Sequence, residues 1–439
     1  MSADASSPGL LAGWRPRRLR ARQGAFWQRL LIAGGGNAAG RALGLLFSLG
    51  LAVLFAPAEY GYMRWAMSAA MLGAIPAAAG PYALACLLGM ARDTPDRQRR
   101  IATVGLTAVG VAALFCGLGT AVVLHVLARP AGGVLAVLVG MTWFSGAMAV
   151  YRGAGAVWQM AALYAGGNAL QLVLVLVLCG LLGITVPELA LVLYGFAWLA
   201  VLVALEWRGR SALSSAPGRC ERRDAVMTWQ AVLGPLARLW APLTAAHAGW
   251  TVWIWADIVL VEYFLGAAMA GYYGLARTLV TLFLLVPEAV ALLLLPHVAA
   301  EGQRARGLTG RLLLLTGTVS AGLLVLIVSV APPVLGWVAG GRYATAAVPL
   351  PGLALGMAVY AEYMVLEQHL VGLGRPGAHA IGVAVMAAGV VAGSAWTLPT
   401  LGLAGMNLVF PVAALAGLAT LLALGWPALR APLPAGERN

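Results

Sequence analysis

Charged and amide side chains recur inside the long apolar runs of this 439-residue chain. A charged side chain at the centre of a membrane helix costs ~2.5–3.5 kcal/mol on the insertion scale, so such residues face one another or a water-filled space. Asn37 and Arg41 are four residues apart and share one helical face. Because a guanidinium binds two phosphate oxygens and keeps its charge, Arg41 suits a diphosphate, or else pairs with an acid of a neighbouring helix.

A second polar stripe combines a base with a deeper acid. Arg277, Thr281 and Glu288 fall on one helical face by their spacing. We expect Glu288 to face a cavity, where an acid can carry a proton or pair with a cation. Arg277 either faces the same cavity or extends its long side chain to the membrane surface.

Uncharged amides form a third stripe on one helical face, with Tyr164, Asn168 and Gln171 at i, i+4 and i+7. Amides suit hydrogen bonds to sugar hydroxyls, and they also join helices within a membrane. We therefore predict a substrate-binding cavity lined by Asn37, Arg41, Arg277, Asn168 and Gln171.

Acids and one histidine supply candidates for ion or proton coupling. Glu362 and His369 are seven residues apart on one face, and Glu367 lies on an adjacent face. An acid beside an imidazole suits a proton relay, because His titrates near neutral pH. A buried hydrogen-bonded pair without a transport role is the alternative. With Asp257 and Glu288, these residues form the predicted coupling set.

The composition shows what must position these groups. Hydrophobic residues make up 62% of the chain and charged residues 10%, whereas a soluble globule has about 25% charged residues. A soluble globule and a disordered chain are both excluded. A helix crosses the hydrocarbon in ~20 residues. Twelve apolar runs meet this length: 31–55, 61–90, 101–127, 132–150, 156–182, 187–206, 236–262, 271–296, 312–331, 346–371, 379–398 and 404–426. The four cysteines have the spacing of neither a metal site nor a disulfide framework.

The arginines predict the orientation of these spans. With the amino terminus inside, 22 arginines fall in inside segments and two, Arg129 and Arg342, in outside ones. Cytoplasmic loops are rich in basic residues. We therefore predict a multi-pass membrane protein with both termini in the cytoplasm. The net charge of +13 fits this topology and anionic membrane lipids, and we expect no nucleic-acid partner.

The longest internal hydrophilic stretch divides the spans six and six. The predicted organisation is a basic tail (1–30), a six-helix bundle (31–206), a cytoplasmic linker (207–233), a second six-helix bundle (234–426) and a tail (427–439). A short repeat supports the division, because Gly61-Tyr62 and Gly271-Tyr272 follow equivalent outside turns 210 residues apart. Many transporters place the substrate path between two such repeats.

Several short motifs resemble those of the Wzx-type polysaccharide flippases, which belong to the multidrug/oligosaccharidyl-lipid/polysaccharide exporter superfamily. They are Gly40-Arg41-Ala42-Leu43-Gly44, Pro57-Ala58-Glu59-Tyr60-Gly61-Tyr62, Gly271-Tyr272-Tyr273-Gly274-Leu275-Ala276-Arg277, Gly340-Gly341-Arg342-Tyr343 and Gly372-Leu373-Gly374-Arg375. Their order and spacing cover residues 31 to 410. One departure is Ile258, because a basic residue often follows the equivalent of Asp257 in that family.

The resemblance implies an all-α protein of the bacterial cytoplasmic membrane, with two six-helix bundles around a central cavity. It also implies transport of an oligosaccharide linked to a polyprenyl diphosphate, from the cytoplasmic to the outer leaflet by alternating access, for surface polysaccharide biosynthesis. Implied partners are this lipid-linked oligosaccharide, membrane lipids, and the polymerase and chain-length proteins of the same pathway. The chain is expected to be no enzyme and to need no metal or other cofactor.

Three other functions remain open from the sequence. An ion-coupled drug exporter of the same superfamily would need a pocket dominated by acids, whereas the mixture of Arg and acids favours an anionic headgroup. A flippase for a cell-wall lipid precursor would share the anionic headgroup. A membrane sugar polymerase or ligase is disfavoured, since no predicted outside loop exceeds ~15 residues and such enzymes need room for catalytic groups.

Overall fold

The computed structural model describes residues 23–78, 80–90, 95–154, 156–213 and 229–430. Within these ranges the chain is almost entirely helical and contains no strand. Most of the predicted amino-terminal tail, the middle of the linker and the end of the carboxy-terminal tail lie outside the described residues.

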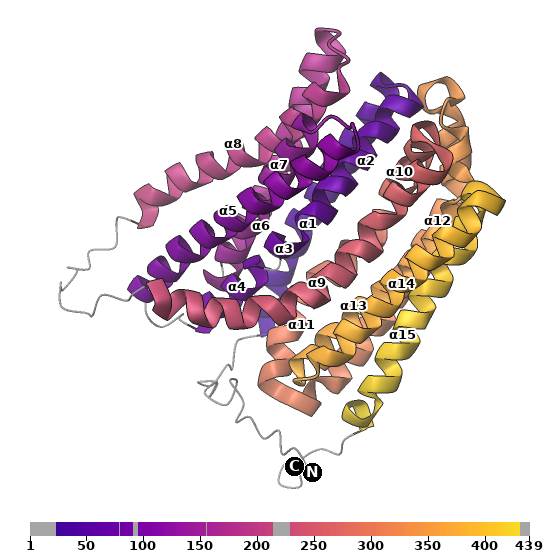
Figure 1. The fold of residues 1–439 in the computed structure, drawn as a ribbon. Helices are drawn as coiled ribbons and strands as arrows, with labels where there is room; N and C mark the ends of the chain where they lie inside the picture. Colours follow the sequence, from indigo (N-terminus) through magenta and orange to yellow (C-terminus); the bar gives the residue numbers. More distant parts are fainter. Residues whose placement is uncertain (1–22, 79, 91–94, 155, 214–228, 431–439) are drawn as a thin grey trace.

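Helices α1 to α8 form the N-terminal half and α9 to α15 the C-terminal half (Figure 1). The first half comprises α1 (Gln23–Leu54), α2 (Pro57–Gly73), α3 (Ile75–Ala78), α4 (Gly80–Met90), α5 (Pro95–Val126), α6 (Gly132–Ala154), α7 (Val157–Val175) with a π-helical extension (Leu176–Leu181), and α8 (Pro187–Leu213). The second comprises α9 (Trp229–Leu265), α10 (Ala267–Val280), α11 (Leu285–Glu301), α12 (Arg306–Trp337), α13 (Leu350–Gly372), α14 (Pro376–Leu401) and α15 (Met406–Arg430).

The predicted twelve passes can be followed in the described residues. By length and composition, nine helical stretches can cross a membrane, and a tenth does so as the bent pair Pro57–Gly73 and Ile75–Leu88. One of the nine, Pro376–Arg430, holds two helices, α14 and α15, which pack side by side in opposite directions (Figure 1). The remaining pass is α13, whose acids and histidine lower its hydropathy. The all-α two-bundle fold is thus confirmed.

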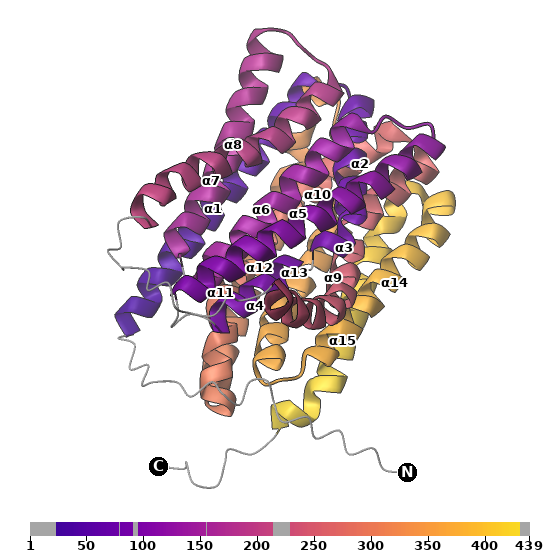
Figure 2. The same ribbon diagram turned by 60° about the vertical axis from the view of Figure 1, so that its left-hand side comes forward.

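We call the end where α1 begins and α15 ends the inner end, and the opposite end the outer end, after the predicted orientation (Figure 1). The halves pack mainly within themselves: α1 packs on α7 and α6 on α8, while α14 packs on α9 and α15. Figure 2 shows the N-terminal part of α9 reaching α3 and α4 of the other half. There Val232 and Leu236 of α9 pack with Ala83, Leu84 and Ile101 of the N-terminal half. The start of α9 therefore joins the two halves.

The second pass is broken. The α2 and α3–α4 segments meet at an angle of 61°, close to Pro76, whose missing N–H cannot continue a helix. Next to the break, the Pro76 carbonyl accepts a hydrogen bond of 2.7 Å from the Trp240 indole of α9. The donor comes from the other half, so this bond ties α3 to α9.

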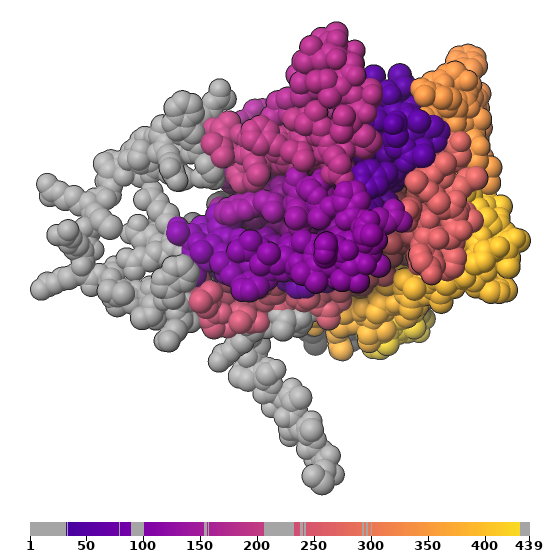
Figure 3. All heavy atoms as spheres, turned by 45° about the horizontal axis from the view of Figure 1, so that its top comes forward, coloured from indigo at the N-terminus to yellow at the C-terminus, as the bar shows by residue number. Residues whose placement is uncertain are grey.

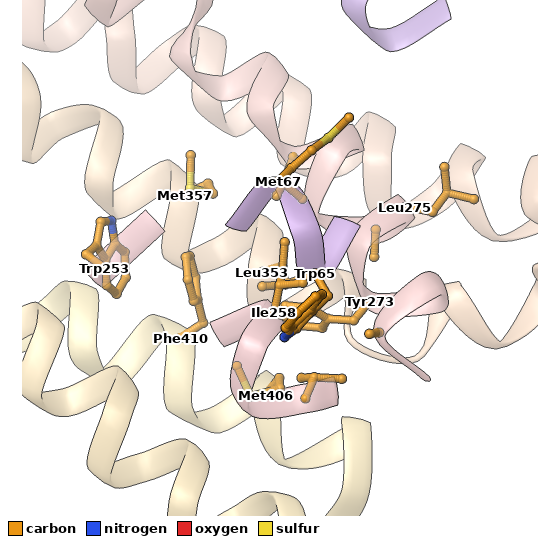
Figure 4. Close-up of a cluster of buried hydrophobic side chains, with 14 of the residues drawn as sticks. Trp65, Met67, Trp253, Ile258, Tyr273, Leu275, Leu353, Met357, Met406 and Phe410 are labelled. Carbon is orange, nitrogen blue, oxygen red and sulfur yellow. The ribbon is translucent and has the colours of Figure 1, made fainter. Parts of the chain in front are cut away.

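The largest apolar cluster joins the two halves near the outer end. Figure 4 shows side chains of α2 among those of α9, α10, α13 and α15, including Trp65, Met67, Ile258, Tyr273, Leu353, Met357 and Phe410. Trp253 is fully buried and stacks on Phe410 at 4.3 Å between ring centroids. It is therefore a packing residue and does not belong to an interfacial aromatic belt.

The outer ends of α2 and α10 meet at two glycines, a contact that we call the glycine seam. A methyl group on Gly61 would overlap the carbonyl oxygen of Ala267, and one on Gly271 would overlap that of Pro57. These are the two glycines of the predicted repeat, so equivalent positions of the two halves touch each other. In Figure 3 the N-terminal and C-terminal halves lie directly against each other.

Candidate substrate-binding site between the halves

An ion pair between Arg41 of α1 and Glu288 of α11 crosses from one half to the other, and we call this contact the polar seam. Arg41 Nη2 pairs with Glu288 Oε1, and Arg41 Nε donates to Glu288 Oε2 at 3.2 Å. The side chain of Arg41 is 10% exposed and that of Glu288 is 33% exposed. Both residues were predicted to face the interior, and the structure brings them together although 247 residues separate them.

Two further contacts position the pair. Asn37, one helical turn before Arg41, donates its amide to Glu288 Oε2 at 3.0 Å, so the predicted face of α1 acts on a single carboxylate. Arg41 Nη1 donates to the Thr281 carbonyl at 3.1 Å. Thr281 begins a 3-10 turn (Thr281–Leu284), in which the Leu285 N–H bonds to the Leu282 carbonyl; a carbonyl oxygen has two lone pairs, so that of Thr281 can accept from Arg41 as well.

Tyr82 of α4, which was not predicted from the sequence, lies within electrostatic range of Glu288. Its hydroxyl is within electrostatic range of the carboxylates of Glu288, Glu367 and of the Arg152 guanidinium, so protein surrounds it on several sides. Yet Tyr82 is 44% exposed. The exposed part must therefore border a space that water can enter between the halves. No polar neighbour in the sequence marks Tyr82, which stands in an apolar run.

An acid–imidazole pair from α13 and α14 reaches toward the same space. His379 Nδ1 is 3.3 Å from Glu367 Oε2, and both side chains are largely buried. The Tyr363 hydroxyl donates to the His379 carbonyl at 3.0 Å, and Gln368 donates to Glu367 at 3.1 Å. The sequence analysis assigned Glu367 but missed His379. Their similar distances from the turn at Gly374, where two antiparallel helices meet, could have indicated this pairing.

The two other predicted members of α13 lie on a different side. His369 Nδ1 is 2.9 Å from Thr309 Oγ1 of α12. Glu362 faces Gly317 of α12, and its Oε1 is buried without a hydrogen-bond partner among the described residues. Glu362 and His369 thus share one face, as their spacing predicts, but this face packs inside the C-terminal half and not on the space at Tyr82.

Arg277 and Asp257 also differ from the expectation. Arg277 Nε donates to Asp257 Oδ2 at 3.0 Å, and the guanidinium lies 4.6 Å from the centre of the Phe410 ring. Asp257 also accepts bonds from the Tyr273 hydroxyl at 2.7 Å and the Ile258 N–H at 2.8 Å. Both charges are buried and mutually compensated within the C-terminal half. The placement of Arg277 in a substrate cavity is therefore corrected, because its charge is already used by Asp257.

The two amides of α7 bind different partners inside the N-terminal half. Gln171 Nε2 donates to the Tyr194 carbonyl of α8 at 3.2 Å and so joins two helices. Asn168 Nδ2 donates to the Tyr164 carbonyl one turn earlier in α7 at 2.8 Å, a bond within its own helix. Both residues are buried, and Gly40 and Gly44 of α1 pack closely against Tyr164 and Asn168. The helix-joining interpretation of this stripe therefore describes the hydrogen bond of Gln171, whereas Asn168 reaches α1 by packing alone.

The site therefore combines one guanidinium, an acid that it holds, a second acid paired with an imidazole, and an exposed tyrosine. Among the described residues no group of three or more His, Cys, Asp or Glu could hold a metal ion. Such a site can bind an anionic group at Arg41 if the group displaces Glu288, and it can accept a proton or a cation at Glu367.

No family model and no curated protein sequence matches the chain. Solved structures do. The lipid II flippase MurJ in an inward closed conformation is similar with a TM-score of 0.66 at 12% identity, over 90% of this chain and 87% of that chain. The eukaryotic MATE transporter AtDTX14 is similar with a TM-score of 0.67 at 13% identity, over 93% of this chain and 96% of that chain.

A third similar structure is an inward-facing multidrug resistance MATE family transporter of the MOP superfamily. Its TM-score is 0.63 at 14% identity, over 88% of this chain and 94% of that chain. MOP stands for multidrug/oligosaccharidyl-lipid/polysaccharide. These similarities extend over nearly the whole length of both chains. The chain has the fold of the MurJ and MATE transporters.

Proposed function

We propose that this protein is a flippase that moves an oligosaccharide linked to a polyprenyl diphosphate from one leaflet to the other by alternating access. The observation that carries the proposal is the polar seam, an Arg–Glu pair that joins the two halves and remains partly exposed. A similarly folded protein is described as a lipid II flippase, which supports a lipid-linked substrate.

Displacement of Glu288 links binding to motion. A diphosphate carries more negative charge than one carboxylate and offers two oxygens to the guanidinium fork of Arg41. When the diphosphate takes Arg41, α1 and α11 lose the ion pair that holds them together, while Asn37 can still donate to Glu288. A ligand shifts a conformational equilibrium by its different affinities for the two states, so the diphosphate favours the state with separated helices.

Proton or cation coupling is assigned to Glu367 within this proposal. Of the predicted coupling residues, Asp257 is neutralised by Arg277, Glu288 by Arg41, and Glu362 and His369 face α12. Within the described part of the chain, Glu367 is the acid of this set that pairs with a histidine, His379, and it lies in electrostatic range of Tyr82. Transport that stays the same with and without proton or sodium gradients would remove this assignment.

An exporter of organic cations is the second candidate. Similarly folded proteins are described as multidrug resistance transporters, and Glu367 lacks an arginine partner among the described residues, so it could attract a cation. This function predicts that Glu367→Gln abolishes transport of a cationic dye and that Arg41→Ala does not.

The test is flipping of a fluorescent polyprenyl-diphosphate-linked glycan by the full chain in proteoliposomes. We expect Arg41→Ala to lower the rate at least about tenfold, because each of the two charge-assisted hydrogen bonds of a bidentate contact strengthens binding several-fold. Arg41→Lys should fall in between, because lysine keeps the charge and loses the fork. Gly50→Ala is the matched control on α1, since no atom lies within 4 Å of the added methyl group. An unchanged rate in Arg41→Ala would refute the proposal.

A further inference from the structure

We propose that Tyr82, His247 and Trp250 form a sugar-stacking surface that receives the first sugar of the glycan next to its diphosphate. This inference rests on the proposed function. It assigns the first sugar of the substrate to residues that take no part in the ion pair between Arg41 and Glu288.

The three rings form a continuous aromatic surface that spans both halves. The ring centroid of Tyr82 of α4 lies 5.4 Å from that of His247 of α9, and His247 lies 5.2 Å from Trp250. Trp250 donates its indole N–H to the Tyr360 hydroxyl at 2.8 Å, which fixes its ring. One face of a pyranose ring presents C–H groups, and these pack on an aromatic ring through dispersion.

Open hydrogen-bonding groups border this surface. The Tyr82 hydroxyl makes no hydrogen bond to the described residues, and Tyr82 as a whole residue is 44% exposed. His247 Nε2 is buried and also has no partner in the described part of the chain. A polar atom buried without a partner costs free energy. Sugar hydroxyls, which both donate and accept, can satisfy the two groups.

The position fits a sugar attached to a bound diphosphate. Glu288 pairs with Arg41 and is also in electrostatic range of the Tyr82 hydroxyl. A phosphate that replaces Glu288 on Arg41 therefore places the adjoining sugar toward Tyr82.

The surface is also held in place before binding. The contact of α4 with α9 is fixed by the Trp240–Pro76 hydrogen bond and by the apolar cluster around Leu84 and Leu236. A preformed surface lowers the entropy cost of binding.

The experiment compares two lipids on the purified full chain. One is a short polyprenyl diphosphate, and the other is the same lipid with one N-acetylhexosamine on its terminal phosphate. We expect the sugar to raise the affinity about tenfold, as one stacking contact with hydrogen bonds does. Tyr82→Ala and His247→Ala should remove this increment and leave the affinity for the sugar-free lipid unchanged, which also shows that the variants are folded.

Two controls separate stacking from other causes. Tyr82→Phe keeps the ring and should retain most of the increment. Tyr263→Ala removes a tyrosine that is 76% exposed at the outer end of α9 and should change nothing.

The outcomes keep this inference distinct from the proposed function. If Tyr82→Ala weakens both lipids equally, or neither, the stacking surface is refuted while the flippase proposal stands. If the wild type binds neither lipid, or if Arg41→Ala leaves both affinities unchanged, the proposed function fails as well. If Tyr82→Ala instead weakens binding of tetraphenylphosphonium, and the sugar brings no increment in the wild type, the rings serve an organic cation and the inference is overturned.

Discussion

The glycine seam and the polar seam join the halves by different means. At the glycine seam, backbone meets backbone at Gly61 and Gly271. Close by, the Tyr343 hydroxyl donates to the Phe55 carbonyl at 3.2 Å in a buried position. The polar seam instead depends on one charge pair, Arg41 with Glu288, whose acid is 33% exposed.

This difference indicates which contact a ligand can open. Shape complementarity between backbones presents no group that a ligand could replace, so the glycine seam yields only when the halves move as bodies. A charge pair in a partly wet place can be exchanged for a stronger anion. We therefore expect the substrate to enter at the polar seam and the glycine seam to respond, with the following predictions in decreasing order of effect.

The largest effect is expected for Gly61→Leu or Gly271→Leu. Either side chain would overlap a backbone carbonyl of the other half, and backbone cannot move aside as a flexible side chain can. We predict loss of the closed outer end and at least about a tenfold fall in transport, since overpacking costs ~1–3 kcal/mol or more. Spin labels at Ala58 and Tyr263 in a cysteine-free background should show a longer distance across the seam.

The control for this prediction is Gly119→Leu, because an added Cβ at Gly119 meets no atom within 4 Å. A Gly271→Leu variant with an unchanged label distance and normal transport would mean that the close approach of α2 and α10 is not part of the working cycle.

The next effect concerns a charge pair inside one half. Asp257→Asn leaves the Arg277 guanidinium buried and unpaired, and breaking such a pair costs about 3–5 kcal/mol. We predict a clear loss of thermal stability in detergent without any change in the label distance across the glycine seam. Asp257→Asn together with Arg277→Met should recover part of the loss, because the double variant leaves no lone charge. A stable single variant would contradict this account.

Glu288→Gln should lower thermal stability less than Asp257→Asn does, and it should strengthen binding of the diphosphate. It removes the acid that competes for Arg41 while the amide keeps the shape, so we predict tighter binding of polyprenyl diphosphate, about threefold to tenfold. Transport should nonetheless slow, since the pair no longer re-forms to close α1 on α11. Weaker binding of polyprenyl diphosphate by Glu288→Gln would show that Glu288 does not compete with the ligand.

The sequence predicted the spans and the faces of single helices, because hydropathy and the 3.6-residue period are local properties. Thus the shared face of Asn37 and Arg41 was predictable, and so was that of Glu362 and His369. The partners across helices were not, because they depend on which helices pack together. Arg41 and Glu288 are 247 residues apart, and no local pattern links them.

The pairing of Asp257 with Arg277 and the role of Tyr82 were also not predicted, for different reasons. Asp257 and Arg277 lie at similar distances on either side of the turn at Gly266, so antiparallel packing of α9 and α10 could have indicated their pairing. Tyr82 had no such signal, because its importance arises from the bend between α2 and α4 and from the crossing of α9, and neither position follows from hydropathy.

The smallest effect is expected at the outer surface. Arg129 Nη2 pairs with Glu262 Oε1 at 2.9 Å and links the halves as Arg41 and Glu288 do, but Arg129 is 41% exposed. Exposed ion pairs contribute about 0–1 kcal/mol and are screened by salt. Arg129 also lies 5.0 Å from the centre of the Trp65 ring, a contact that is less sensitive to salt. We predict that Arg129→Ala changes transport less than about twofold, and that Glu262→Gln changes it even less because the contact with Trp65 remains. If either variant matches the effect of Gly271→Leu, charge and not backbone fit closes the outer end.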